Sequence, residues 1–339
     1  MGSLFFGKAK NVVSLIFIIC MIFTSCNSAA PTDFNGVGKT PPPSVVVTAP
    51  ATERADVAPT ATALETTPPT AKPTAKPERP LKSLGALKVY FLDVGQADSI
   101  LITVDGSSML IDAGNNPDGP GIVDYLQDKG ITKLDYVVAT HPHEDHIGGM
   151  DDVIYNFDIG KVIMSKATAT TKTYRDVISA QKSKGLSTSY SYLGERFSLK
   201  GAKFEVLSPD RLYDETNENS IVLRMVFGSE SFLFCGDADI VNEATMLAND
   251  EPADSDVIKI GHHGSTTSTA SEFLDAVSPD FAVISVGEDN SYNHPSQLAL
   301  DTIKSVGARL FRTDRDGTVI FSSDGKTIKV AEETTSIDG

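Results

Sequence analysis

The sequence contains little cysteine and no tryptophan. Of its three cysteines, Cys20 lies in an apolar N-terminal segment and Cys26 directly follows that segment, so only Cys235 remains in the part with globular composition. A disulfide framework is therefore excluded as a source of stability within that part. Because Cys235 follows an apolar run, we expect its thiol to be buried and chemically inert.

Positive charge is also scarce. The formal net charge is −16, and from residue 81 onward 22 Lys and Arg stand against 40 Asp and Glu. An acidic surface repels a phosphate backbone, so the composition gives no support to a protein that binds nucleic acid regardless of sequence. The sequence shows no local basic groove that would offset this charge.

Long apolar runs are missing too. Residues 12–23 form a mostly apolar segment that follows Lys8 and Lys10 and is too short to cross a bilayer comfortably as a helix. A basic start, a short apolar segment and small residues are typical of a secretory signal. The end, Thr24-Ser25-Cys26, resembles a bacterial lipoprotein box, which implies a signal peptide over residues 1–26 and a lipid on Cys26. We expect an outward-facing lipoprotein at the cell membrane; the alternative is an uncleaved membrane anchor.

Residues 27–83 are rich in Pro, Thr and Ala. Eleven prolines between Pro31 and Pro80 exclude a regular helix or a central strand. We expect an extended, solvated stalk there. The composition becomes globular from residue 84, so we predict one domain over residues 84–331, followed by a tail over residues 332–339.

Strand and helix patterns alternate along this domain. Strands are predicted at residues 88–93, 99–104, 108–112, 134–139, 161–165, 203–207, 221–227, 231–235, 256–260, 281–285, 308–312 and 318–322. Helices are predicted at residues 121–129, 147–156, 173–182, 241–248, 271–277 and 296–306. This order predicts a layered α/β (α+β) domain with two sheets.

The six histidines all follow strand-like runs, and three of them belong to the segment His141-Pro142-His143-Glu144-Asp145-His146. Two histidines one residue apart point the same way in an extended chain and can share a metal ion. The Asp145-His146 pair can then bind a second ion nearby. Mixed imidazole and carboxylate ligands suit Zn, Mn or Fe.

This H-x-H-x-D-H pattern resembles the signature of the metallo-β-lactamase-fold superfamily, and the resemblance extends over residues 88–321. It implies a four-layer αββα sandwich. It also implies that Asp112 orients the metal loop, that Asp237 bridges two ions and that His262 is the late histidine ligand.

Further motifs resemble the ComEC competence-protein group of this superfamily. They are residues 91–99, Asn219-Ser220, His262-His263-Gly264-Ser265, Ser285-Val286-Gly287 with Asn290 and His294-Pro295, and residues 312–317. The full competence proteins also have a membrane channel, which this sequence does not contain. The resemblance therefore covers only their hydrolase domain, and DNA uptake is not carried over.

One departure from the superfamily pattern concerns the first ion. Many members have another histidine between the first cluster and the bridging aspartate, but none occurs here between His146 and Asp237. The ion at His141 and His143 would then keep a place for water, for substrate or for an amide such as Asn219. A single ion bound by Asp145, His146, Asp237 and His262 is the alternative. An open position favours catalysis over a structural role.

The resemblance implies a metal-dependent hydrolase, with one or two divalent ions, Zn or Mn, that activate water for in-line attack on phosphorus. Asp145 is expected to act in the reaction as well as in binding metal, and His263 and His294 are candidate acid–base groups. Side chains expected to support the ligands are Asp112, Asn219, Asp93, Gln96, Asp98 and Ser99. Lys259 and Arg315 are candidates to stabilise the charge of the phosphoryl group, but we favour the alternative that both are ordinary surface or strand-end charges.

The substrate class implied is a phosphodiester in DNA, a nucleotide or a cell-wall polymer. The first alternative is hydrolysis of a lactone, thioester or lactam in the same fold. The second is a non-catalytic surface binding module that retains its metal for folding. The lipid anchor implies a membrane partner, and no protein partner can be inferred.

Overall fold

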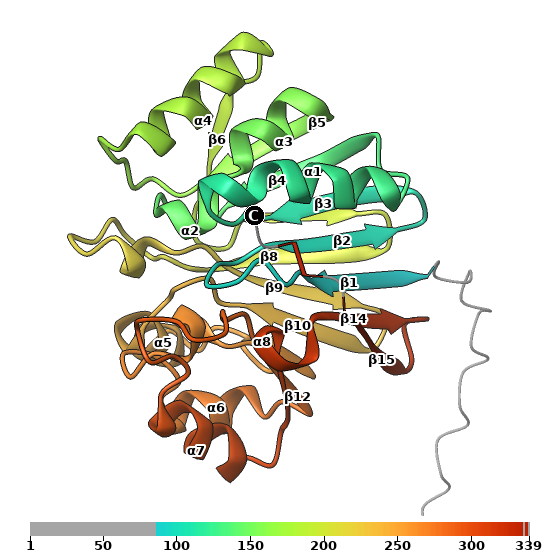
Figure 1. Ribbon diagram of the computed structural model, residues 1–339. Helices are drawn as coiled ribbons and strands as arrows, with labels where there is room; N and C mark the ends of the chain where they lie inside the picture. Colours follow the sequence, from blue (N-terminus) through green and yellow to red (C-terminus); the bar gives the residue numbers. More distant parts are fainter. Residues whose placement is uncertain (1–85, 335, 338–339) are drawn as a thin grey trace, which may run out of the picture. The chain divides into compact units, whose positions relative to one another are not determined.

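The computed structural model describes residues 86–334 and 336–337 (Figure 1). The predicted signal peptide, the lipid site at Cys26 and the stalk lie outside the described residues. Within the described part of the chain, every helix is too short or too polar to traverse a lipid bilayer.

Two β-sheets organise the described residues. The first has the strand order β15-β14-β1-β2-β3-β4-β5-β6 and the second β13-β12-β11-β10-β9-β8-β7. The strands of the first are β1 (Leu87–Phe91), β2 (Ile100–Val104), β3 (Ser107–Ile111), β4 (Lys133–Ala139), β5 (Asp158–Met164), β6 (Thr188–Tyr190), β14 (Thr318–Ser323) and β15 (Ile328–Glu333). Those of the second are β7 (Arg196–Leu199), β8 (Ala202–Ser208), β9 (Val222–Phe227), β10 (Glu230–Phe234), β11 (Val257–Lys259), β12 (Phe281–Ile284) and β13 (Arg309–Arg312).

Helices cover the outer face of each sheet (Figure 1). The first sheet carries α1 (Gly119–Asp128), α2 (Glu144–Ile147), α3 (Met150–Asn156) and α4 (Lys172–Ser183). The second carries α5 (Ile240–Ala248), α6 (Ser271–Val277) and α7 (Gln297–Ser305), while α8 (Thr313–Asp316) joins β13 to β14. Short 3₁₀ turns are η1 (Asn116–Asp118), η2 (Asn217–Asn219) and η3 (Gly261–Gly264). Side-chain caps fix several helix starts, as where Ser296 accepts from the amide of Ala299 at α7.

The layers are held together by three apolar cores. The central core lies between the sheets, where the rings of Phe91 and Phe234 approach to 6.2 Å between centroids. Alternate residues of β1 face opposite ways, so Phe91 enters the central core while Tyr90 packs in the core beneath α1. The third core lies under α5, α6 and α7 and includes the buried Cys235. The four-layer αββα sandwich expected from the sequence is confirmed.

The parallel pairing of strands determines the position of the loops that carry the candidate site. β3 pairs parallel with β4 in the first sheet, and β10, β11 and β12 pair parallel in the second. Parallel neighbours end at the same edge of a sheet, so the loops after these strands lie close together. The histidine-rich segment follows β4, and Asp237 and His262-His263 follow β10 and β11.

The predicted helix over residues 147–156 is wrong in one respect. Two helices, α2 and α3, replace it, and they are separated at Gly148 and Gly149. A Cβ on Gly148 would lie 2.1 Å from the carbonyl carbon of Asn115, so the backbones touch and the chain bends away from a single helix axis. This bend places Asp145 and His146 on a short helix of their own.

Three strands are absent from the prediction, namely β6, β7 and β15. All three are edge strands with few fully buried side chains, so they lack a strong apolar signal. β15 also continues beyond the boundary expected at residue 331, to Glu333, and Ile337 is buried against the first helical layer.

Candidate metal centre

Asp112 fixes the start of the histidine-rich loop. It leaves β3 with a left-handed φ of 57°, and its two carboxylate oxygens accept hydrogen bonds from the amide and hydroxyl of Thr140 at 2.8 and 2.7 Å. Its Oδ2 also lies 2.8 Å from Nδ1 of His146. The ring of His146 is therefore held from behind, with Nε2 directed toward the centre of the loop cluster, which is the orienting role expected of Asp112.

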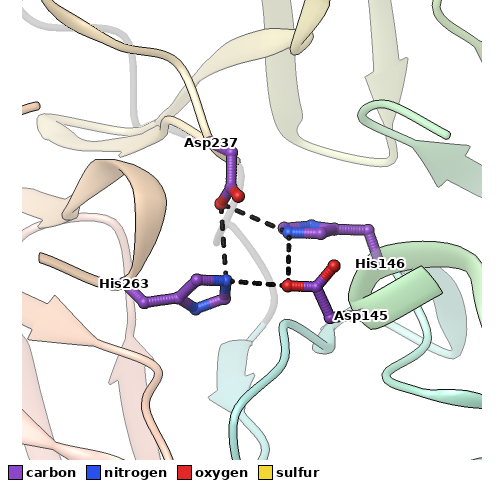
Figure 2. Close-up of side chains that lie close together, drawn as sticks. All are labelled: Asp145, His146, Asp237 and His263. Atoms are coloured by element: carbon purple, nitrogen blue, oxygen red, sulfur yellow. Dashed lines mark hydrogen bonds and ion pairs between the residues drawn. The ribbon is translucent and has the colours of Figure 1, made fainter. Parts of the chain in front are cut away.

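Three other side chains converge in front of this ring, and together with His146 they form a group of four (Figure 2). The ligand atoms of Asp145, His146, Asp237 and His263 all lie within 4.8 Å of one another. Nε2 of His146 is 3.2 Å from Oδ1 of Asp237, and Nε2 of His263 is 3.3 Å from Oδ2 of Asp145. The two sheets contribute equally, since Asp145 and His146 follow β4, whereas Asp237 and His263 follow β10 and β11.

The donor atoms of this group fit a divalent ion. Nε2 of His146 and Oδ1 of Asp237 are buried and have no hydrogen-bond partner among the described residues. Leaving a buried polar atom unpaired costs about 1–3 kcal/mol, so such atoms call for a ligand. Two imidazole nitrogens and two carboxylate oxygens are a donor set that Zn or Mn accepts.

A second set of donors lies beside the first. Nε2 of His141 is 3.1 Å from Nδ1 of His143 and 3.9 Å from Oδ2 of Asp237. Nε2 of His262 is 3.8 Å from the same Asp237 oxygen. The two oxygens of Asp237 therefore face different donor groups, Oδ1 toward His146 and Oδ2 toward His141. This arrangement suits the bridging role implied for Asp237.

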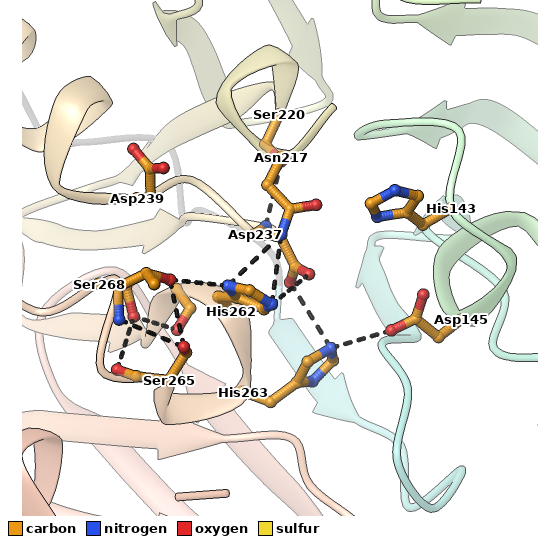
Figure 3. Close-up of polar contacts among 12 residues, drawn as sticks. His143, Asp145, Asn217, Ser220, Asp237, Asp239, His262, His263, Ser265 and Ser268 are labelled. Carbon is orange, nitrogen blue, oxygen red and sulfur yellow. Dashed lines mark hydrogen bonds and ion pairs between the residues drawn. The ribbon is translucent and has the colours of Figure 1, made fainter. Parts of the chain in front are cut away.

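Of the two neighbours His262 and His263, the structure places His263 in the group of four. Both have left-handed backbone angles, with φ of 46° and 51°, and this tight turn sends their rings in different directions. His263 is buried, its Nδ1 lies 2.9 Å from the carbonyl oxygen of Ser285, and its Nε2 enters the group of four. His262 turns away, with its Nδ1 3.0 Å from Oγ1 of Thr267. Its Nε2 lies 3.2 Å from Nδ2 of Asn217, and Figure 3 shows these two side chains side by side. Adjacent histidines in a sequence do not reveal which one turns inward.

Asn219, expected beside the ligands, lies elsewhere. The side-chain amide of Asn219 accepts from the amide of Tyr213 and donates to the carbonyl oxygens of Tyr213 and Glu215, so it closes its own loop and offers nothing to a metal. Asn217 lines the cavity in its place. The sequence did not indicate this displacement.

A fully buried ion pair lies behind the donors. Nζ of Lys259 is 3.0 Å from Oδ2 of Asp98, and both side chains have about 1% exposure or less. Oδ1 of Asp98 is 3.5 Å from Nδ1 of His263, and the amide of Asp98 donates to the carbonyl oxygen of Asp145. Lys259, the last residue of β11, therefore braces the ligands and cannot contact a substrate, contrary to the phosphoryl-stabilising role considered from the sequence. Arg315 is exposed and does not line the cavity.

The charges of the group favour a positive charge at its centre. Burial lowers the pKa of His146, but the carboxylates of Asp237, Asp145 and Asp112 outweigh burial and raise that pKa well above its usual value. Burial would raise the pKa of Asp237, but His146 and His263 lower it well below its usual range. A divalent cation would be stabilised by the same carboxylates.

An open cavity of about 330 Å³ gives access to these donors. Its lining residues are Gln96, His143, Glu144, Asp145, Asn217, Asp237, His262, His263, Tyr292 and His294. Neither Lys nor Arg is among these described lining residues. His294 lies at the mouth, with its ring centroid 5.6 Å from that of His262, and its Nδ1 is buried without a hydrogen-bond partner in the described chain.

Comparison with known proteins agrees with this geometry. Residues 92–288 match the Metallo-beta-lactamase superfamily. The sequence is 30% identical over 253 residues to ComE operon protein 3 of Bacillus subtilis, covering 69% of this chain and 33% of that protein. It is 31% identical over 249 residues to competence protein ComA of Neisseria gonorrhoeae, covering 73% of this chain and 33% of that protein. The chain thus spans about a third of the length of these relatives.

Among solved structures, the fold resembles the metallo-beta-lactamase fold protein YhfI of Bacillus subtilis. The TM-score is 0.50 at 12% sequence identity, and the match covers 70% of this chain and 100% of that one. At this identity the likeness concerns the fold alone. The resemblance to competence proteins, predicted from separate motifs, is confirmed by the two relatives.

Proposed function

This chain belongs to the metallo-beta-lactamase superfamily, and we propose that it is a phosphodiesterase that uses one or two divalent ions, Zn or Mn, on the outer side of a membrane. The family supports a metal-dependent hydrolase. We choose a phosphodiester as the substrate class because the relatives are competence proteins. The observation that carries the proposal is the position of Asp237, whose two oxygens face two separate groups of donors.

We assign one ion to Asp145, His146, Asp237 and His263, and a second to His141, His143 and Asp237. Oδ1 of Asp237 approaches His146 at 3.2 Å, while Oδ2 lies 3.9 Å from His141. Divalent ions in such a site lower the pKa of water toward about 7 and neutralise charge on phosphoryl oxygens. With Asp237 removed, both groups would lose a donor.

The protein residues position the reacting groups. Asp112 and the carbonyl of Ser285 fix the rings of His146 and His263 from behind, so that each presents Nε2 to the group of four donors. Asp145 is partly exposed at the cavity wall, where its carboxylate can hold a proton from the attacking water. His262 and His294 stand on the open side of the cavity, where one of the two rings can pass a proton to the leaving oxygen.

The charge of the cavity favours a phosphodiester over more highly charged phosphates. Its described lining holds acidic side chains and histidines but no Lys or Arg, so the ions alone must offset the substrate's charge. A diester carries a single negative charge at each phosphorus. An open cavity in front of the donors also argues against an ion kept only for folding.

We place the enzyme at the cell surface. A lipid on Cys26 would attach it to the membrane, and the stalk of residues 27–83 would hold the domain away from the membrane. The support is the basic, apolar and small-residue order of the leader and the proline content that follows it. A phosphodiester in a nucleotide, in DNA or in a cell-wall polymer would be within reach of such an anchored domain.

Two assays run side by side test this function. Metal-loaded wild-type protein should hydrolyse bis(p-nitrophenyl) phosphate, Asp237→Ala should not, and neither should hydrolyse the lactam nitrocefin. Hydrolysis of nitrocefin alone by the wild-type protein would overturn the proposal in favour of another bond in the same fold. Absence of both activities in protein that contains its metal would favour a binding module.

A further inference from the structure

An exposed aromatic ring stands at the mouth of the cavity. Tyr292 lies in the loop between β12 and α7 and is 67% exposed, the largest exposure among the large apolar side chains of the described residues. Its ring is stacked with that of His294, with 5.7 Å between centroids and 27° between planes. His294 in turn is nearly parallel to His263, at 6.4 Å and 20°. Near-parallel rings thus lead from a metal-binding histidine to solvent.

The loop that carries Tyr292 is held firmly in shape. The side chain of Asn290 donates to the carbonyl oxygens of Gly287 and His294 at 3.0 and 2.6 Å, and accepts from the amide of His294 at 3.0 Å. These bonds close the loop on both sides of Tyr292. The ring therefore has a defined position before any ligand arrives, which lowers the entropy lost on binding.

The same loop is fastened to the turn that carries His263. The amide of Ser296 donates to the carbonyl oxygen of Gly264 at 2.8 Å. A Cβ on Gly264 would lie 2.7 Å from Cβ of Pro295, so glycine permits this close contact. The distance between the Tyr292 ring and the metal donors is thereby fixed. A subsite that recognises the group next to a reacting phosphate needs such a fixed distance.

We propose that Tyr292 and His294 form a stacking subsite for the base of the nucleoside attached to the scissile phosphate. This inference rests on the proposed function and names its substrate class as a nucleoside phosphodiester. Stacking of a base on an aromatic side chain strengthens binding by about tenfold and tolerates any base, because each has a π-face. Tyr292 supplies a free ring face at the entrance, and the donors lie deeper in the same cavity.

The size and charge of the cavity limit how much of a nucleic acid is bound. A volume of about 330 Å³ is at the small end for a ligand pocket and suits one nucleotide unit. The described lining offers no Lys or Arg to follow a phosphate backbone, and the chain as a whole carries a formal net charge of −16. The subsite therefore binds a small nucleotide or the end of a single strand.

Calorimetric binding to the metal-loaded full-length protein tests the subsite without turnover. Deoxyadenosine 5′-phosphate and 2-deoxyribose 5-phosphate carry the same phosphate and differ only in the base. The wild-type protein should bind the nucleotide at least about tenfold more tightly. Tyr292→Leu should reduce this preference to below about threefold, whereas Tyr292→Phe, which keeps the ring, should preserve it.

A matched control is Tyr155→Leu on α3, where the tyrosine is 49% exposed and does not line the cavity. It should keep the wild-type preference. Equal affinity of the wild-type protein for the two phosphates, or an unchanged preference in Tyr292→Leu, would overturn the subsite. Failure of the proposed function would appear separately, as absent hydrolysis of bis(p-nitrophenyl) phosphate.

Substrate length distinguishes the two sources of the nucleoside. Without cations to follow a backbone, kcat/KM per strand end for a twelve-nucleotide single strand should stay within about threefold of that for a dinucleoside monophosphate. A strand preferred by more than about tenfold, with strong salt dependence, would overturn the small-ligand assignment and indicate a nucleic-acid groove.

Discussion

Nε2 of His146 lies 3.2 Å from Oδ1 of Asp237, and both atoms are buried without a hydrogen-bond partner in the described chain. His146 belongs to the loop after β4 of the first sheet, and Asp237 follows β10 of the second. An ion between them would connect the two halves of the sandwich. Metal binding should therefore contribute to folding as well as to catalysis.

A matched pair of substitutions tests the role of Asp237. Asp237→Asn keeps the shape of the side chain but removes the charge that faces both donor groups, so metal affinity and activity should fall by more than the roughly 10- to 100-fold typical of losing a residue behind a ligand. Asp239→Asn, two residues away, changes the cap of α5 to another good cap and should retain both. Metal analysis and the diesterase assay measure the two effects. Equal losses in both variants would contradict the assignment.

Alanine substitutions at His262 and His263 separate two neighbours that sequence alone leaves equivalent. His263 lies within the compact group of four donors, whereas Nε2 of His262 lies 3.8 Å from Oδ2 of Asp237. His263→Ala should therefore weaken metal binding more than His262→Ala, which should chiefly lower kcat. Competition with a chromophoric chelator measures the affinities. The opposite order would restore His262 as the ligand of this group.

The sequence predicted the layers well because their signals are local. Twelve strand-like runs and six helical patterns depend on periodic apolar residues, and each of them is present in the structure, with the helix over residues 147–156 divided into two. β6, β7 and β15 were missed because sheet edges bury few side chains. The division of the helix depends on a backbone contact with Asn115, which no local pattern shows.

The sequence predicted which residues form most of the candidate site. It did not predict how their side chains are oriented or which contacts they make. His141, His143, Asp145 and His146 share one short segment, and Asp237 was placed by its family motif. The inward turn of His263, the closed loop of Asn219 and the pairing of Lys259 with Asp98 all depend on tertiary contacts between segments far apart in sequence. The sequence did not show that Lys259 is buried and paired with Asp98.

Lys259→Met should destabilise the protein strongly. The substitution leaves the carboxylate of Asp98 buried without its partner, and breaking a buried pair in this way costs about 3–5 kcal/mol. Adding Asp98→Asn should recover part of the loss, because the unpaired charge is then gone. Denaturant unfolding measures both, with Arg196→Ala as a control at an exposed pair with Glu205 that should matter little. A Lys259→Met protein as stable as the control would refute the bracing role.

Glu243 should make stability depend on pH. Burial raises its pKa to about 7, although the amides of Ala270 and Thr269 oppose this by donating hydrogen bonds to it. The protonated form is favoured in the folded state, so its stabilising effect is complete below the unfolded pKa near 4.5 and is lost as the pH rises through about 7.

Glu243→Gln removes this titration. The free energy of unfolding of the variant relative to wild type should increase from pH 4.5 to pH 8 by up to about 3 kcal/mol. Glu272→Gln, at an exposed position of α6, should show no such trend. A difference between Glu243→Gln and wild type that stays constant across this range would show that Glu243 keeps the same charge state throughout.

The most direct measurement of the central claim is the metal content of the purified full-length protein after equilibration with Zn or Mn, determined by mass spectrometry together with the thermal midpoint. One or two ions per chain should be retained, and their removal by a chelator should lower the midpoint by about 5–10 °C, reversibly, as expected for ligands that bind the folded state alone. Protein that retains no transition metal and unfolds at the same temperature with and without it would contradict the account.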